Sequence, residues 1–215
     1  DFIDYNNQID IASVRACFDG ELLKVFDEWY DKYLHWQVAI YFYFVLEPIL
    51  TETLLGGLEE YLRKNEMIDQ LAEFHNAIMA PEKMNAVALE HKMALEVAIK
   101  IKNDSNDREK LIKRFYNDFV WVPCYDIKDE AYSIEHFDEE IDKLLSLTDD
   151  KLQGELEKFI QEYEDRKKLF DNIIGQIKDG RLIELSKIMH RLVYYKDFRD
   201  DKRREAGYAG KRFMR

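Results

Sequence analysis

Apolar residues recur at helical spacing along almost the whole chain, and residues 115–137 form the clear interruption of that pattern. Leu22, Phe26, Trp29 and Tyr33, for example, follow one another at steps of three and four and therefore share one helix face. Only 8 Gly and 3 Pro punctuate the 215 residues, and strand-like alternation is nearly absent. This pattern predicts an all-α fold of long helices joined by short loops.

We expect an irregular bundle of about seven helices that forms a single domain over residues 1–215. The polar run at residues 103–106 is the clearest loop and marks a candidate sub-boundary, because short polar side chains compete with the helix for backbone hydrogen bonds. The chain begins without Met and ends inside a predicted helix. We therefore interpret it as a piece of a longer protein.

Proline and glycine set the expected helix boundaries. Pro48 disfavours helical geometry at the residue before it, so a first helix is predicted to end there and a second to occupy residues 49–63. Gly180 is predicted to stop a helix over residues 148–178 in a left-handed conformation, before a last helix over residues 181–215.

The interruption itself predicts a proline- and aromatic-containing loop near residues 121–132. Pro123 cannot continue the preceding helix smoothly, since it has no amide hydrogen and its ring clashes with the turn before it. Ser133 is predicted to cap the next helix, and the acidic residues that follow it suit the positive end of a helix dipole.

The formal net charge is −12 and the pI is near 5.0, which argues against nucleic acid as a partner. Acidic residues dominate residues 126–165, whereas basic residues dominate residues 196–215. Both segments are interpreted as solvated helix faces. The alternative is a basic terminal helix that docks a phosphate-bearing or acidic partner.

No membrane segment or disulfide framework is expected. The longest apolar run, residues 38–46, is far shorter than the roughly 20 residues that span a bilayer, so it is interpreted as part of a buried core helix. Neither Cys17 nor Cys124 belongs to a CxxC or other metal-ligand spacing. A reducing, cytoplasmic setting fits this cysteine usage.

No catalytic, cofactor-binding or metal-binding residue is predicted. The Glu-x-x-His pairs of a di-metal helical bundle are absent, as are HExxH, the Walker A loop and GxGxxG. Cys124 and His136 lack the orienting third group of a Cys–His pair, so Cys124 is interpreted as a structural thiol. His190 is interpreted as a core or interface residue. Four aromatic residues of the first helix could stack on a ligand, but core packing is preferred: Trp29, Trp36, Tyr41 and Phe44.

Two segments support a family resemblance. In residues 115–137, FYNDFVWVPCYDIKDEAYSIEHF, an aromatic helix end is followed by a loop and a new helix. This stretch resembles the helical region of phosphoenolpyruvate-utilising enzymes, the phosphoenolpyruvate synthase and pyruvate, phosphate dikinase-like group. The matching residues are Phe115, Phe119, Trp121, Val122, Tyr125, Ser133 and Phe137. The later segment LVYYKDFRDDKRREAGYAGKRF is similar to a helix of that family with a basic–Asp–aromatic–Arg cluster, here Lys196, Asp197, Phe198 and Arg199.

The resemblance, which covers residues 85–215, implies a helical linker or scaffold domain rather than an enzyme in isolation. Such a domain would position a nucleotide-binding domain and a swivelling phosphohistidine domain. These would be its partners, as other domains of a parent phosphotransferase chain. ATP and Mg are implied for that parent and no cofactor for this chain. His190 does not match the phosphohistidine motif. Trp121, Tyr125, Asp197 and Arg199 are the candidate docking surface for a swivelling domain or substrate.

Two other functions stay open. The chain could be a free-standing helical interaction module, or a small-molecule-binding bundle whose aromatic helices form a pocket. The residues favour no particular substrate or oligomeric state.

Overall fold

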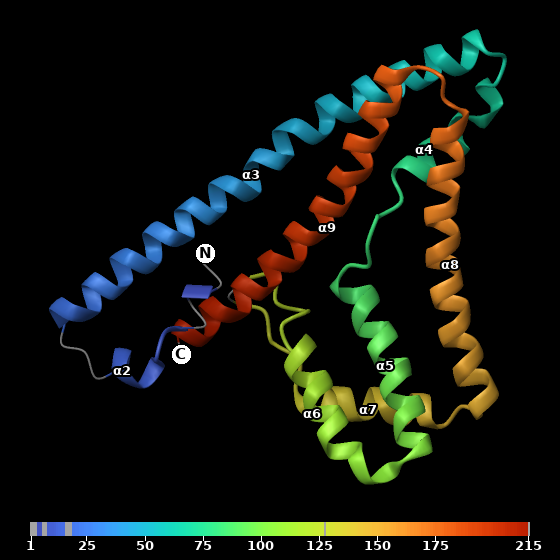
Figure 1. Cartoon of the computed structure of the whole chain (residues 1–215). Coiled ribbons are helices and arrows are strands. Elements are labelled where there is room, and N and C mark those ends of the chain that lie inside the picture. Colours follow the sequence, from blue (N-terminus) through green and yellow to red (C-terminus); the bar gives the residue numbers. More distant parts are fainter. Residues whose placement is uncertain (1–3, 6–7, 16–18, 127, 215) are drawn as a thin grey trace.

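The computed structural model describes residues 4–5, 8–15, 19–126 and 128–214, so the expectation for Cys17 falls outside the described residues. This part of the chain is helical without a strand, which confirms the all-α prediction (Figure 1). The helices are α2 (Ile11–Arg15), α3 (Asp19–Lys64), η1 (Ile68–Gln70), α4 (Leu71–Ile78), α5 (Ala86–Asn103), η2 (Ser105–Asp107), α6 (Arg108–Phe119), α7 (Ile134–Leu145), α8 (Asp149–Gln176) and α9 (Gly180–Met214).

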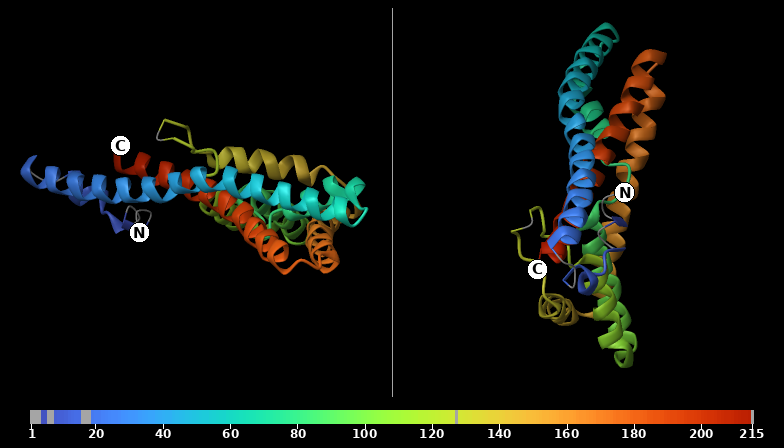
Figure 2. Two further views of the ribbon diagram at one scale, coloured as in Figure 1. Left: turned by 90° about the horizontal axis from the view of Figure 1, so that it is seen from above. Right: turned by 90° about the vertical axis from the view of Figure 1, so that its left-hand side faces the viewer.

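Three long helices make the frame of the molecule. In Figure 1, α3 and α9 converge where α9 begins, and α8 runs down the other side to the short helices α5, α6 and α7. The left view of Figure 2 shows the N-terminal end of α3 extending past the end of α9. The first half of α3 is therefore the part of the frame with the fewest neighbouring helices.

Buried apolar side chains form two main groups at opposite ends of the frame. The first, here called the lower core, joins α5, α6, α7 and the start of α8 around Phe115 and Phe137, whose rings are 4.7 Å apart at 73°. The second, the upper core, joins the second half of α3 to α4, the end of α8 and the first half of α9. Helix α8 links them, because Leu152 belongs to the lower core and Ile173 to the upper.

The candidate sub-boundary at residues 103–106 coincides with the connection between α5 and α6. Ile101 of α5 and Ile112 of α6 are both buried in the lower core, on either side of that connection. The larger division of the buried side chains lies between the two cores, along α8.

The helix break predicted at Pro48 is wrong, because α3 continues through this residue from Asp19 to Lys64. Pro48 removes one helical hydrogen bond and crowds the preceding turn, yet neighbouring contacts hold the helix on both sides. Glu47 forms an ion pair with Lys196 of α9 at 3.0 Å, and Leu54 is fully buried in the upper core. Tertiary packing therefore overrides the local preference of proline.

The left-handed stop predicted at Gly180 is also wrong, since no described glycine has a positive φ. The chain leaves α8 through an extended Ile177, with φ −78° and ψ 125°. Asp179 then caps the next helix, as its Oδ1 accepts hydrogen bonds from the amides of Arg181 at 2.9 Å and Leu182 at 3.1 Å. Gly180 is thus the first residue of α9 rather than the end of α8.

Other helix starts follow the capping rules. Ser133 Oγ accepts a hydrogen bond from the His136 amide, which confirms the cap predicted for α7, and Thr148 caps α8 in the same way. None of the described helices is both long and apolar enough to cross a membrane.

Candidate functional site

The aromatic loop, residues 120–133, is a folded turn system rather than an extended linker; residue 127 lies outside the described part. Its start is held by hydrogen bonds from the Val122 amide to the Phe119 carbonyl, at 3.0 Å, and from the Cys124 amide to the Trp121 carbonyl, at 2.9 Å. The Tyr132 amide donates to the Val120 carbonyl at 3.2 Å and closes the base of the loop. These hydrogen bonds fold the backbone of the loop back on itself.

Helix α9 lies directly against this loop. A Cβ atom on Gly207 would come within 2.8 Å of the Cys124 carbonyl oxygen, so glycine permits the close approach of the two backbones. Lys211, only 7% exposed, donates from Nζ to the Asp129 carbonyl at 2.6 Å and pairs with Glu130 at 3.1 Å. The Cys124 thiol is fully buried, and this burial raises its pKa, as expected for a structural thiol rather than a nucleophile.

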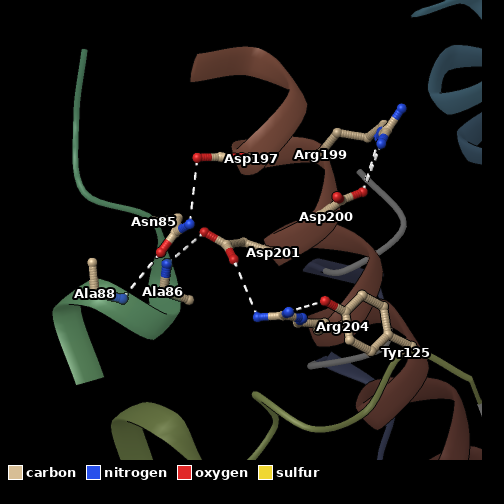
Figure 3. A network of polar contacts seen from close by, with 9 residues as sticks. All are labelled: Asn85, Ala86, Ala88, Tyr125, Asp197, Arg199, Asp200, Asp201 and Arg204. Carbon is tan, nitrogen blue, oxygen red and sulfur yellow. Dashed lines mark hydrogen bonds and ion pairs between the residues drawn. The ribbon is translucent and has the colours of Figure 1, made fainter. Parts of the chain in front are cut away.

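Arg204 connects the aromatic loop to the rest of α9. Its guanidinium carbon lies 4.2 Å from the centre of the Tyr125 ring, and its Nη2 donates a hydrogen bond to the Tyr125 hydroxyl (Figure 3). Its Nη1 lies 3.8 Å from Asp201 Oδ1. Burial lowers the pKa of Arg204, and the charge of nearby Glu90 opposes that effect.

The same turn of α9 also caps α5. Asp201 Oδ2 accepts a hydrogen bond from the Ala86 amide at 2.7 Å, and the Asn85 side chain donates to Asp197 at 3.3 Å (Figure 3). Asn85 in turn accepts from the Ala88 amide at 3.0 Å. Burial, with repulsion from nearby carboxylates, raises the pKa of Asp201 to about 6; burial likewise raises the pKa of Asp197. This acidic turn is therefore held in place by the start of α5.

The four residues predicted as a docking surface do not share one exposed face. Tyr125 is 43% exposed, whereas Trp121 is partly buried against the lower core. Asp197 is engaged by Asn85, and the Arg199 side chain, only 11% exposed, pairs with Asp200 at 2.8 Å. In Figure 3, Arg199 points away from Asn85 and Asp201. Tyr125 is the one of these four residues that offers a large exposed surface.

His190 is buried as the sequence predicted. Its ring stacks on Phe170 with 3.8 Å between ring centres, and its Nδ1 lies 3.2 Å from the Ile78 carbonyl oxygen. The ring thus has a packing role in the upper core, close to α4.

Tyr125 also lines a hollow between the aromatic loop, α9 and α3. The hollow has a volume of about 230 Å³, and Trp29, Tyr33 and Tyr41 line it from α3. Trp29 is buried against Ala206 of α9, which confirms its expected packing role. The side chains of Trp36 and Phe44 lie outside the described part of the structure.

An exposed apolar surface, here called the α3 stripe, continues from this hollow along α3. Most of its members follow one another at steps of three or four residues and so run along the helix. Val38 is the most exposed, at 72%. The stripe consists of Leu22, Leu23, Phe26, Tyr30, Leu34, Val38, Tyr41, Val45 and Ile49. The prediction that residues 38–46 belong to a buried core helix is wrong for Val38, Tyr41 and Val45, because these side chains are exposed.

A separate polar group lies between α5 and α7. One ligand atom each of Glu90, His136 and Glu140 lies within 4.8 Å of the others. Burial is the main cause that raises the pKa of Glu90 to about 7, and the charge of Glu140 adds to it. The Glu-x-x-His pattern, which requires Glu three residues before His, does not detect this group. Here Glu140 follows His136 by four residues, and the third residue comes from a distant helix.

No protein-family model, curated protein or solved structure matches the chain.

Proposed function

We propose that this chain is a noncatalytic helical scaffold and that the α3 stripe docks a neighbouring folded module of a phosphotransfer protein. The observation that carries the proposal is the stripe itself. Contiguous apolar surfaces of this kind are uncommon on monomeric proteins and mark sites of association.

The dimensions of the stripe suit a protein partner. It extends over residues 22–49, which corresponds to about 40 Å of helix at 1.5 Å per residue. A standard protein interface covers about 800 Å² on each partner. A row of large apolar side chains of this length supplies such an area, and the aromatic residues within it are the types that most often anchor interfaces.

A small-molecule site is the weaker alternative. The hollow beside Tyr41, at about 230 Å³, is smaller than the roughly 300–1,000 Å³ of most ligand pockets. Since Tyr41 belongs to both the hollow and the α3 stripe, the hollow is better explained as an extension of the docking surface. A side chain of the docked module would fill it.

The identity of the docked module rests on the family resemblance of residues 115–137 and 196–199. In a phosphoenolpyruvate synthase-like protein, neighbouring modules would bind ATP and Mg and carry the phosphorylated histidine. The buried His190 suits a chain that performs none of this chemistry. A cytoplasmic setting belongs to the same proposal. A rigid support lowers the entropic cost of bringing the reacting groups of two mobile modules together, because the support already fixes their relative geometry.

Photo-crosslinking in the full-length gene product tests the proposal. A photoreactive phenylalanine analogue at Val38 should crosslink to a peptide from another module of the same protein. The matched control is the analogue at Glu155, an exposed residue on α8. Crosslinks from position 38 only to lipid, to the same helix of a second copy, or to nothing would contradict the proposed partner.

The double substitution Val38→Asp and Val45→Asp tests whether docking matters. Both side chains are exposed, so the helix content should stay unchanged while phosphotransfer by the full-length protein falls about tenfold or more, equivalent to ~1.4 kcal/mol of lost docking. Glu155→Gln should leave the rate unchanged. A normal rate in the double variant would remove the docking role of the stripe.

A further inference from the structure

Glu90, His136 and Glu140 bring three potential metal ligands together from two helices. Glu90 lies on α5, and His136 and Glu140 lie four residues apart on α7, which places them on the same face of that helix. The nearest ligand atoms of the three side chains are all within 4.8 Å of one another. We propose that these residues bind one divalent transition-metal ion, with Zn²⁺ and Mn²⁺ as the best candidates.

The spacing needs little adjustment to accept an ion. Zinc binds nitrogen and carboxylate oxygen at about 2.0–2.2 Å, so two ligands of one ion lie roughly 3–4 Å apart. The atoms of Glu90, His136 and Glu140 are already close to that range. Small side-chain rotations would close the remaining gap, while the helix backbones keep their positions.

The environment of Glu90 points independently to a missing positive partner. Glu90 is only 8% exposed, yet its carboxylate has no hydrogen bond or salt bridge with the residues that the structure describes. The carboxylate oxygens keep some contact with solvent, so leaving this partly buried charge unpaired is costly, though less so than full burial would be. Arg204 attracts Glu90 but forms no ion pair with it, whereas Glu140 repels it. A divalent ion would compensate both carboxylates at once.

The histidine is held in place by its neighbours. The His136 ring stacks on Tyr132 with 3.9 Å between ring centres and 8° between planes, and the Ser133 cap fixes the first turn of α7. His136 is exposed to solvent whereas Glu90 is buried. An ion would therefore enter from the His136 side, and its remaining coordination positions would face water or an external ligand.

The ligand set selects the class of metal. One imidazole nitrogen with two carboxylates suits Zn²⁺, Mn²⁺ or Fe²⁺, whereas Mg²⁺ and Ca²⁺ prefer oxygen ligands alone. The absence of a thiolate from the cluster argues against a soft ion such as Cu⁺. Because the ligands come from α5 and α7, a bound ion would also join two helices of the lower core.

Metal titration of the tag-free, EDTA-treated chain tests the site. Isothermal calorimetry with ZnCl₂ and MnCl₂ should show one ion bound per chain, and the thermal midpoint should rise with metal concentration. Metal binding should weaken by about tenfold or more in each of the variants Glu90→Gln, His136→Gln and Glu140→Gln. Replacing even a residue that only hydrogen-bonds to a metal ligand typically lowers metal affinity about 10–100-fold.

Matched controls separate the site from general surface charge. Glu139→Gln removes an exposed carboxylate beside Glu140, and His35→Gln removes an exposed imidazole on α3, whose side chain is 79% exposed. Both variants should bind metal within about twofold of the unmodified chain, a difference of ~0.4 kcal/mol. Circular dichroism of each apo variant verifies that its helices are intact.

Pulsed electron paramagnetic resonance of bound Mn²⁺ detects the metal ligands directly, so a change in stability alone cannot produce the expected signal. Coupling to an imidazole nitrogen should be present in the unmodified chain and absent from His136→Gln. The proposal is overturned if no saturable binding is seen up to about 1 mM metal. A Kd of about 1 mM corresponds to a binding free energy of only ~4 kcal/mol. It is equally overturned if the three ligand variants bind as tightly as the controls; the two carboxylates would then share a proton instead.

Discussion

Gly207 shows how one residue lets the aromatic loop rest on α9. The backbone carbonyl of Cys124 occupies the space where a side chain would start, so the contact leaves no room for a Cβ atom. Lys211 and Arg204 reinforce the same contact through hydrogen bonds to Asp129 and Tyr125. The position of Tyr125, and hence one wall of the hollow beside α3, depends on this approach.

Gly207→Ala should therefore lower the free energy of unfolding by about 1–3 kcal/mol, because a backbone oxygen cannot rotate away from the new methyl group. Urea unfolding measures the change. Gly154→Ala on α8 is the matched control, since its Cβ would meet nothing within 4 Å. That control should gain about 0.5–1 kcal/mol from better helix propensity. A Gly207→Ala chain as stable as the unmodified one would contradict the close approach.

Asp201 makes stability depend on pH. Its pKa is raised from 3.8 to about 6, so the folded state favours the protonated carboxyl group. This contribution to stability is fully present below the unfolded pKa and is lost as the pH rises through the folded pKa of about 6. After allowance for solvent screening, the loss should amount to on the order of 1–2 kcal/mol at neutral pH.

Asp201→Asn should remove that loss while keeping an oxygen that accepts from the Ala86 amide. We expect the variant to match the unmodified chain near pH 4 and to be about 1–2 kcal/mol more stable near pH 7. Urea unfolding at both pH values measures this. Asp171→Asn, at an exposed position on α8, should show no such pH-dependent difference. An equal effect of Asp201→Asn at both pH values would rule out the titration.

At the scale of elements, α3 is the helix whose extent the sequence mispredicts and whose exposed surface carries the proposed function. Pro48 lies inside it, is exposed, and leaves one carbonyl without its usual helical donor. Two local signals, the proline and the apolar run at residues 38–46, suggested a break and a buried helix. Both signals are local, and neither carries information on the distant partners of α3, namely Lys196 and the upper core.

Pro48→Ala should stabilise the chain by about 1–2 kcal/mol, because alanine restores the amide donor and relieves the clash with the preceding turn. Thermal and urea unfolding measure the gain. Val45→Ala, one turn earlier and also exposed, should stay within about 0.5 kcal/mol of the unmodified chain. A loss of stability in Pro48→Ala would contradict this expectation and would show that proline at this position favours the packing of α3.

Over the whole molecule, the sequence predicted the helical class and the aromatic loop because periodicity and proline chemistry are local. The Ser133 cap was predictable for the same reason. The contacts of Tyr125 with Arg204 and of Glu90 with α7 join residues far apart in the chain, and no spacing in the sequence encodes them. The division into two cores likewise depends on how α8 runs along one side of the frame, with Leu152 in the lower core and Ile173 in the upper core (Figure 1).

The two cores should respond separately to substitution. Phe115→Leu removes ring contacts to Phe119 and Phe137 in the lower core and should cost about 1–2 kcal/mol. Hydrogen exchange should then accelerate in α5, α6 and α7 more than in α4. Leu58→Ala, at a fully buried position of the upper core, should cost about 2–4 kcal/mol and show the opposite pattern. Equal acceleration throughout the chain in both variants would mean that the two cores unfold as one unit, coupled through α8 and α9.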